Sequence, residues 1–280
     1  FAANASPLQE GLLWVGSDDG LVHITKDGGK NWTNITPKGM PEWMMINSVE
    51  PSPFDVGTCY VAGTRYKLGD FSPYLYKTTD YGASWTRIDK GIPSEHFTRV
   101  VRADPNRRGI LYAGTETGMY VSFNDGLRWE AFQQNLPIVP ITDLTIKDNS
   151  LIVATQGRSL WMLDDLTVLH QLEKTVDKPV LYTPKPTYRV QGRGGRSSLT
   201  AGTNLPNGVI THFYIPEVNA KKDSVALSFH AADGRLIKHF STEDKKNKLT
   251  VEKGGNQFVW NMRYDGCLLY TSDAADDSLR

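Results

Sequence analysis

The feature that most limits the fold of this chain is a turn motif that occurs three times. Each copy has the pattern Ser/Thr-x-Asp/Asn-x-Gly-x-x-Trp, and the copies occupy residues 25–32, 78–85 and 122–129. Successive copies are roughly 45 to 55 residues apart, a spacing that suits one blade of a repeated β architecture. A single Asp-Gly turn carries little information. Three copies with tryptophan at a fixed offset predict a repeat.

The residue types in the motif suit a corner between two antiparallel strands. A short aspartate or asparagine side chain can accept hydrogen bonds from nearby backbone N–H groups, and glycine adopts a positive φ without a Cβ clash. The tryptophan then packs where the next strand begins. We therefore predict a structural role for three residues of each copy. They are Asp27, Gly29 and Trp32, then Asp80, Gly82 and Trp85, then Asn124, Gly126 and Trp129.

Short apolar segments around the motif predict four strands in each repeat. The second strands of the four repeats are expected at residues 13–16, 59–63, 110–114 and 151–155. The fourth repeat ends near residue 166 without a copy of the motif, so we expect it to be a closing blade. The predicted fold class is all-β, beginning with a partial β-propeller of about four blades over residues 1–172.

The motif resembles the Asp-box, or bacterial neuraminidase repeat, of β-propellers such as those of sialidases and sortilins. Residues 11–172 are similar to the end of sortilin-like propellers in large secreted bacterial proteins, which often carry the label glycosyl hydrolase. The resemblance implies a protein secreted to the periplasm or the cell exterior, with a signal peptide and the remaining blades upstream. In such propellers residues 155–158 usually read Thr-His-Gly-Arg, whereas this chain has Gln156.

Composition narrows the classes of partner. Lys plus Arg and Asp plus Glu both total 31, so no broad basic field is available to hold nucleic acid. The alternative is that residues 191–196, which contain an Arg-Gly-Gly motif, bind RNA. This motif occurs once, in a chain with no net charge. No apolar run approaches the length of about 18 residues needed to cross a bilayer. We therefore predict no nucleic-acid partner and no membrane span.

The distribution of metal-ligating residue types predicts no metal site and no cofactor. Cys59 and Cys267 are the two cysteines, and neither has a metal-ligand spacing. The six histidines are scattered along the chain in the same way. The alternative is a cation bound by Asp164 and Asp165. The competing interpretation gives these two residues a turn or capping role.

A second domain is predicted after a change in composition. Residues 173–204 are rich in proline, glycine, arginine and serine and are interpreted as a linker or long loop. Residues 205–266 resemble the immunoglobulin-like sandwiches that follow secreted bacterial propellers. Strands are expected at 208–215, 225–230 and 254–261, with a hairpin turn at 232–234. Because a sandwich needs about seven strands, we expect a truncated immunoglobulin-like β-sandwich with an unpaired edge.

The end of the chain is predicted to be a non-native tail. Residues 267–276 resemble a translated sequencing adapter, because TGT CTC TTA TAC ACA TCT GAC GCT GCC GAC encodes them in order. The competing interpretation is a genuine acidic tail. We expect a bacterial, metagenomic fragment whose native sequence ends near Gly266, with no packed partners for residues 267–280.

Strand directions predict which loops would face a ligand. Strands of a blade alternate in direction, so loops between second and third strands share one face with the loops that enter the next blade. The longest of these loops, residues 63–73, exceeds a tight turn, as binding loops on rigid scaffolds do. The ligand-binding candidates are Trp43, Arg65, Tyr66, Lys67, Asp70, His96, Glu116 and Arg158, with Asp18, Asp19, Glu95, Thr117 and Gln156 on the same face. In the competing interpretation, Arg65 and Asp70 pair with each other while Tyr66 and Phe71 pack the loop.

Two functions are compatible with this face. The first is a binding module for a peptide, protein or glycan. The alternative is a sialidase-like glycoside hydrolase, which combines an arginine cluster, a tyrosine nucleophile and an acid/base carboxylate from blades around the ring. The side chains that would supply such groups are Arg65, Arg158, Tyr66, Asp70 and Glu116. Their spacing does not establish that they converge, so no catalytic residue is assigned.

Overall fold

The computed structural model describes residues 2–172, 177–188, 205–218 and 223–264. The chain divides into two compact units, unit 1 (Phe1–Leu166) and unit 2 (Thr167–Arg280), so unit 1 ends slightly before the expected domain end at residue 172. The centre of the expected linker and the adapter-like tail with Cys267 lie outside the described residues. No helix in the described ranges is long and apolar enough to cross a bilayer.

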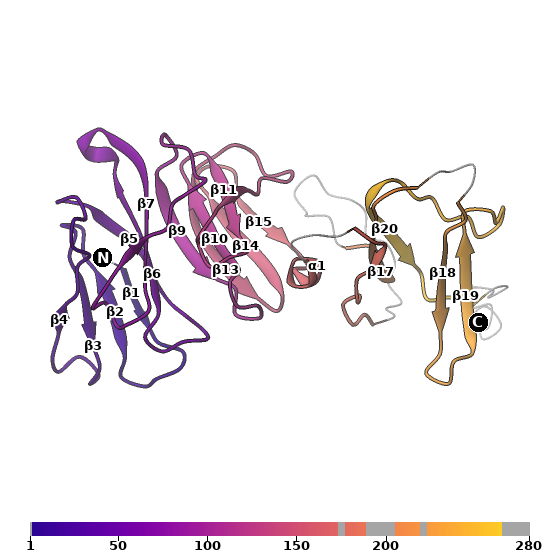
Figure 1. The fold of residues 1–280 in the computed structure, drawn as a ribbon, viewed down its shortest axis with the longest axis horizontal. Helices are drawn as coiled ribbons and strands as arrows, with labels where there is room; N and C mark the ends of the chain where they lie inside the picture. Colours follow the sequence, from indigo (N-terminus) through magenta and orange to yellow (C-terminus); the bar gives the residue numbers. More distant parts are fainter. Residues whose placement is uncertain (1, 173–176, 189–204, 219–222, 265–280) are drawn as a thin grey trace, which may run out of the picture. The chain divides into compact units, whose positions relative to one another are not determined.

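Unit 1 consists of antiparallel sheets that follow one another along the chain (Figure 1), here called blades 1 to 4. Blade 1 contains β1 (Ala2–Ala5), β2 (Leu13–Gly16), β3 (Val22–Thr25) and β4 (Thr33–Asn34). Blade 2 contains β5 (Met45–Pro51), β6 (Cys59–Arg65), β7 (Asp70–Thr78) and β8 (Thr86–Arg87), with the 3-10 turn η1 (Tyr66–Leu68) between β6 and β7. Blade 3 contains β9 (Thr98–Ala103), β10 (Leu111–Thr115), β11 (Gly118–Ser122) and β12 (Glu130–Ala131). Blade 4 contains β13 (Ile141–Lys147), β14 (Ser150–Thr155) and β15 (Leu160–Leu163).

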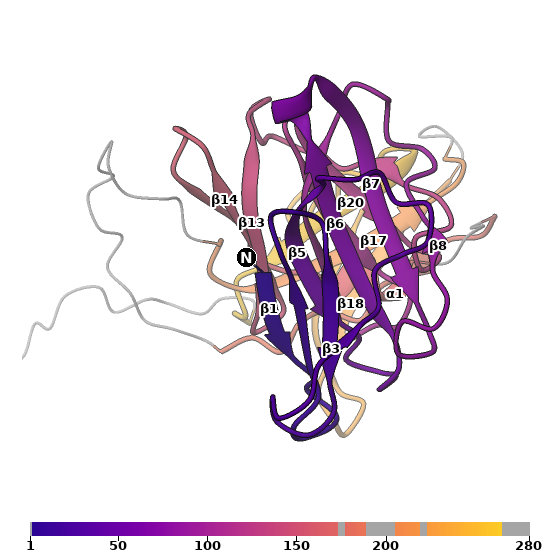
Figure 2. The same cartoon turned by 90° about the vertical axis from the view of Figure 1, so that its left-hand side faces the viewer.

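The order of these strands confirms the all-β prediction and is consistent with propeller blades. In each blade the strands pair in sequence order, and the predicted second strands coincide with β2, β6, β10 and β14. Blade 4, which lacks a copy of the motif, has three strands in the described part of the chain. Figure 2 shows β5, β6 and β7 running side by side in blade 2.

The blades are held together by apolar layers between neighbouring sheets. Successive side chains of a strand point to opposite faces, so a middle strand with both faces covered is buried throughout. In β6, Val61 lies in a cluster with Trp14 of blade 1, whereas Ala62 lies in a cluster with Val101 of blade 3. The two layers are called junction 1–2 and junction 2–3 below.

Glycine in the second strand lets the next blade approach closely. A Cβ atom on Gly16 would lie 2.2 Å from Cγ2 of Ile46, the side chain that blade 2 presses against it. A Cβ atom on Gly114 would lie 2.6 Å from Cγ2 of Ile141 in blade 4. The small residues seen in the predicted second strands are therefore needed for inter-blade packing.

The three motif copies form the same hydrogen-bonded turn. In each copy the Ser or Thr hydroxyl donates to the Asp or Asn Oδ1 atom, at 2.8 Å in the first two copies and 3.0 Å in the third. The same Oδ1 atom accepts the backbone N–H four residues later, at 3.0, 2.9 and 2.9 Å. These bonds hold the pKa of Asp27 at about 2, the bond from the Asn31 backbone contributing most.

The motif tryptophans differ in burial. Trp129 is 1% exposed and its Nε1–H donates to the Ile88 carbonyl of blade 2. Trp85 is partly buried and donates to the Ile35 carbonyl of blade 1 at 2.7 Å. Trp32 is 44% exposed and donates within its own turn to Gly29. Each buried ring docks on the blade before it, and Trp32 belongs to the first blade of this chain.

Unit 2 contains α1 (Thr167–Gln171) and two small sheets. One sheet is formed by β16 (Val180–Leu181), β17 (Val209–Ile215) and β20 (Gly254–Trp260), and the other by the hairpin of β18 (Ala226–His230) and β19 (Leu236–Ser241). The expected strands and hairpin turn are therefore present. Aromatic rings join the two sheets, with centroid distances of 4.4 Å for Phe229–Trp260 and 4.5 Å for Phe240–Phe258.

Candidate functional site

The long loop of blade 2 is closed by an ion pair between its two ends. Arg65 Nη1 lies 3.0 Å from Asp70 Oδ2, and Tyr74 Oη donates to the same oxygen at 2.7 Å. Arg65 Nε also donates to the Glu42 carbonyl at 3.1 Å, which ties the loop to the segment entering blade 2. Between Arg65 and Asp70, the 3-10 turn η1 is followed by Gly69, whose φ of +76° favours glycine. Arg65 and Asp70 therefore pair with each other, as the competing interpretation supposes for these two residues.

The environment of Asp70 keeps its carboxylate ionised. Partial burial alone would raise its pKa, but hydrogen bonds from Tyr74, from Ser72 and from Arg65 outweigh this and lower the pKa to about 2. A general acid needs a pKa near the working pH. Asp70 is therefore suited to holding the loop in shape and is poorly suited to donating a proton at neutral pH.

Tyr66 packs onto blade 3 through an aromatic and cationic cluster. Its ring stacks on Phe97 with centroids 5.1 Å apart and an interplanar angle of 14°. The Phe71 ring also packs against this cluster, with its centroid 6.1 Å from that of the Phe97 ring. The Arg99 guanidinium lies 5.7 Å from the Tyr66 ring and 5.2 Å from the Phe97 ring, and it pairs with Glu116 at 2.6 Å. The cluster fixes the loop of blade 2 to the start of blade 3.

Three large apolar side chains in the long loop of blade 2 or in the segment entering that blade are exposed. Trp43 is 67% exposed, Leu68 is 57% exposed and Phe71 is 46% exposed. Phe71 extends the Tyr66–Phe97 stack, and Trp43 follows the residue whose carbonyl binds Arg65. Exposed large apolar side chains that form a patch are typical of interaction surfaces. We call Trp43, Leu68 and Phe71 the apolar rim.

The other candidates differ in whether they join this cluster. His96 Nδ1 lies 2.6 Å from Tyr120 Oη, and Glu116 belongs to the cluster through Arg99. Lys67 is exposed at the tip of the loop. Arg158 is exposed on blade 4, and no hydrogen bond or ion pair between described residues links it to Arg65. The remaining face residues Asp18, Asp19, Glu95 and Gln156 are exposed and Thr117 is partly buried.

The paired acidic residues of blade 4 have a turn role. Asp165 accepts a hydrogen bond from Asn149 Nδ2 at 3.1 Å, and the Asp164 carbonyl accepts one from Ser150 Oγ at 2.9 Å. These contacts agree with the turn or capping interpretation. Within the described ranges, no group of three or more His, Cys, Asp or Glu side chains is placed to hold a metal ion.

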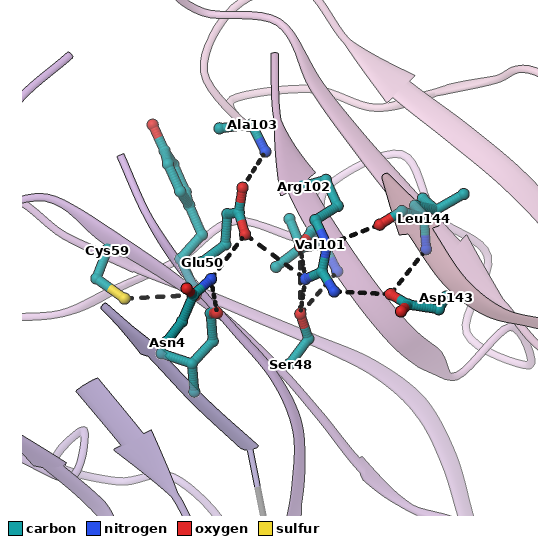
Figure 3. A network of polar contacts seen from close by, with 11 residues as sticks. Asn4, Ser48, Glu50, Cys59, Val101, Arg102, Ala103, Asp143 and Leu144 are labelled. Atoms are coloured by element: carbon teal, nitrogen blue, oxygen red, sulfur yellow. Dashed lines mark hydrogen bonds and ion pairs between the residues drawn. The ribbon is translucent and has the colours of Figure 1, made fainter. Parts of the chain in front are cut away.

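A polar network crosses the first strands of the four blades (Figure 3). Asn4 Nδ2 donates to the Val49 carbonyl at 3.3 Å and lies 3.5 Å from Glu50 Oε2. Glu50 in turn lies 3.6 Å from Arg102 Nη1, and Arg102 Nη2 pairs with Asp143 at 2.7 Å. Asn4, Glu50, Arg102 and Asp143 come from β1, β5, β9 and β13. Each blade thus contributes one residue to the inner edge of unit 1.

Glu50 is the carboxyl in unit 1 whose protonation is most sensitive near neutral pH. Burial raises its pKa to about 7, although Arg102 and the Ala103 N–H act in the opposite direction. Glu50 and Arg102 also line a pocket of about 360 Å³ at the inner edge. A carboxyl with a pKa close to 7 can accept or donate a proton at physiological pH.

Several of these residues were missed by the analysis of the sequence. Phe97 and Arg99 lie two positions apart around the start of β9, and only the fold brings them beside the loop of blade 2. Glu50 and Arg102 occupy the same place in successive first strands, and a strand-by-strand alignment of the repeats would have found them. The predicted loop residues Arg65, Tyr66, Asp70 and Glu116 do lie in one connected cluster.

Comparison with known proteins gives partial matches. No protein-family model matches the chain. Over 111 residues, 38% of the chain, it is 29% identical to the oligoxyloglucan-reducing end-specific xyloglucanase of Emericella nidulans, of which this covers 13%. Over 110 residues it is 30% identical to vacuolar protein sorting/targeting protein 10 of Laccaria bicolor, of which this covers 7%. The aligned parts are a small share of these longer relatives.

The solved structures that match this chain do so with low sequence identity. Ycf48 bound to D1 peptide matches with a TM-score of 0.44 and 20% identity, covering 58% of this chain and 54% of that one. The GH74 xyloglucanase from Xanthomonas campestris matches with a TM-score of 0.46 and 12% identity, covering 90% of this chain and 44% of that one. With its three turn motifs and its successive antiparallel sheets, the chain is an Asp-box-type β-propeller segment, related in sequence to parts of xyloglucanases and of vacuolar protein sorting/targeting protein 10.

Proposed function

We propose that the face carrying the long loop of blade 2 binds a peptide or protein segment with apolar side chains. The observation that supports this most is the apolar rim, whose three large side chains are exposed beside a rigid cluster. Aromatic side chains held on a rigid support are typical anchors of protein interfaces. The sequence similarity to a vacuolar sorting protein is compatible with a binding role.

The charged residues of the same face support binding over catalysis. Arg65 and Asp70 neutralise each other, and so do Arg99 and Glu116. The low pKa of Asp70 removes the nearest carboxyl as a proton donor. These ion pairs therefore fix the shape of the loop and its surroundings, while the apolar rim supplies the contact area for a ligand.

The proposal is tested by probing the whole chain on a peptide array and on a glycan array, and then measuring affinity for the best peptide. Trp43→Ala and Phe71→Ala should each weaken binding about tenfold or more, as truncation of an interface anchor does. Arg65→Ala, Tyr66→Ala and Arg158→Ala form the second set. Tyr66→Ala should weaken binding through loss of the platform, whereas Arg158→Ala should have little effect.

Trp32→Ala is the matched control, because Trp32 is also an exposed tryptophan but lies in an Asp-box turn at the other end of the strands. Its affinity should equal that of the unmodified chain. If the loop variants bind normally while Trp32→Ala abolishes binding, the two faces have been assigned in reverse. Binding to glycans in place of peptides would contradict the proposed ligand class.

Glycoside hydrolysis is the second candidate, favoured by Glu50. Its pKa of about 7 and its position on a pocket with Arg102 are what a proton-transferring carboxyl needs. The Emericella relative is an oligoxyloglucan-reducing end-specific xyloglucanase, so xyloglucan oligosaccharides are the substrates to try. Release of reducing ends by the chain, abolished in Glu50→Gln, would support this candidate. No release at any pH between about 5 and 8, where a group of this pKa changes charge, would exclude it for this chain.

Two finer assignments accompany the proposal. We propose export from the cytoplasm, on the resemblance of the Asp-box repeats to secreted propellers, and an immunoglobulin-like arrangement for unit 2, on its two sheets joined by aromatic rings. Fractionation of cells that express the complete gene tests the first. An experimental structure of unit 2 tests the second.

A further inference from the structure

A groove lies at junction 1–2, at the Asp-box end of the blades and apart from the loop face. Its volume is about 740 Å³, within the range of small-molecule sites. The floor is formed by Ile24, Ile35 and the partly buried Tyr81 and Trp85. The rim carries Lys26, Thr33, Asn34, Lys38, Asp80 and Ser84. An apolar floor with a polar rim is the composition expected of a ligand site.

The groove exists because one connection between blades is a residue longer than its counterpart. After β8, a turn in which Ile92 N–H donates to Asp89 O follows directly on Ile88. After β4, the equivalent turn, in which Met40 N–H donates to Pro37 O, begins one residue further from Ile35. The Lys-Gly pair of the first connection is therefore displaced along the chain.

The displacement changes what the glycine of that pair contacts. A Cβ atom on Gly91 would lie 2.3 Å from the Trp129 carbonyl oxygen, so this connection presses on the Asp-box of blade 3. A Cβ atom on Gly39 would meet nothing within 4 Å. Junction 2–3 is closed over Trp129, and junction 1–2 is left open beside Trp85.

The charges at the rim favour an anionic ligand. Lys26 Nζ lies 3.8 Å from the centroid of Tyr81, and Lys38 is exposed with no ion pair to a described acidic residue. The one rim carboxylate, Asp80, already accepts hydrogen bonds from Thr78 and from Ser84. Lys26 and Lys38 thus line the groove together with one acidic residue, Asp80, which is engaged by its own turn.

We propose that this groove binds an acidic saccharide. The C–H face of a sugar ring is apolar and packs on an aromatic side chain such as Trp85, whereas the ring of Tyr81 is already covered by Lys26. Its hydroxyl groups match the polar side chains of Thr33 and Asn34, and its carboxylate or sulfate group would be held by Lys26 and Lys38 through charge-assisted hydrogen bonds. The site is independent of the peptide-binding face proposed above.

The test uses the whole chain and four probes, observed by NMR through the Trp85 indole N–H. The probes are a galacturonate trisaccharide, a sulfated galactose trisaccharide, a neutral galactose trisaccharide and sodium sulfate. One or both acidic sugars should shift the Trp85 signal, and the pair shows whether carboxylate or sulfate is recognised. Lys38→Ala and Lys26→Ala should each weaken this binding about tenfold, and added salt should weaken it further.

Lys90→Ala is the matched control, because Lys90 is the counterpart of Lys38 at the closed junction. It should leave acidic sugar binding unchanged, and so should Trp43→Ala on the loop face. Retained Trp43→Ala binding also separates this proposal from the peptide-binding function, so either can fail alone. The proposal is overturned if neither acidic sugar binds at millimolar concentration, if the neutral sugar or sulfate alone binds equally well, or if Lys38→Ala and Lys26→Ala bind normally.

Discussion

Junctions 1–2 and 2–3 of unit 1 are built from the same repeat and differ in what they leave accessible. At junction 2–3, Trp129 is 1% exposed and Lys77 and Tyr60 both bind Asp125 of the blade 3 turn, at 2.6 and 2.5 Å. At junction 1–2, the corresponding turn residue is Tyr81, which Lys26 covers, and Trp85 remains partly exposed. The polar contacts of junction 2–3 cover its apolar layer, whereas those of junction 1–2 lie at the border of a groove.

This difference shows how a repeat acquires sites without losing its fold. The Asp-box bonds are the same in all three copies, so the turn itself tolerates different neighbours. Accessibility is decided by the connection that follows the fourth strand, where one added residue moves a glycine away from the next blade. Variation of such connections leaves the hydrogen-bonded ladders intact, in keeping with the tolerance of surface loops to insertion.

The largest expected effect concerns the three tryptophans of the motif. Trp129→Ala should lower the free energy of unfolding by about 3 to 5 kcal/mol, since it empties a fully buried site. Trp85→Ala should cost less and Trp32→Ala, with its exposed ring, about 1 kcal/mol or less. Urea denaturation of the three variants checks this order. Equal losses for Trp85→Ala and Trp129→Ala would show that the two junctions are packed alike.

The glycines of the two connections provide the next effect. Gly91→Ala should cost about 3 kcal/mol, because it adds a steric clash with the Trp129 carbonyl to the penalty of a positive φ. Gly39→Ala carries the φ penalty alone and should cost about 1 kcal/mol. Thermal unfolding of the pair is the measurement. A larger loss for Gly39→Ala would contradict the assignment of the open and closed connections.

At the inner edge of unit 1, junctions 1–2 and 2–3 differ in charge. The charged contact at junction 2–3 makes the free energy of unfolding depend on pH. Junction 1–2 is bridged there by the neutral Asn4 amide, whereas Glu50 and Arg102 bridge junction 2–3. Because the folded-state pKa of Glu50 is raised from 4.5 to about 7, the folded state holds a proton that the unfolded state releases. Stability contributed by this proton is complete below about pH 4.5 and is lost as pH rises to about 7.

Glu50→Gln removes that dependence. Relative to the unmodified chain, the variant should gain stability between about pH 5 and 7, on the order of 1 to 2 kcal/mol. Asp70→Asn is the matched control of opposite sign, because the lowered pKa of Asp70 stabilises the fold above about pH 4 and ceases to do so near pH 2. Urea midpoints across pH measure both. A pH profile of Glu50→Gln parallel to that of the unmodified chain would show that Glu50 does not titrate in this range.

The sequence allowed the blades to be predicted more fully than their contacts. The turn motif and the four second strands depend on local chemistry, which adjacent residues display directly. The stack of Tyr66 on Phe97 and the Glu50–Arg102 pair join different blades, so they depend on how sheets pack and leave no local pattern. The exposure of Trp32 was missed for the same reason, since burial of the motif tryptophan depends on the preceding blade.

The most direct test of the difference between the junctions is the hydrogen exchange of the three indole N–H groups, recorded in one series of NMR spectra. Assignment follows from Trp32→Phe, Trp85→Phe and Trp129→Phe. The Trp129 N–H, buried and bonded to Ile88, should exchange only through global unfolding, Trp85 faster and Trp32 fastest. Equal protection of Trp85 and Trp129 would contradict an open junction 1–2, and with it the groove that this junction is proposed to offer to an acidic saccharide.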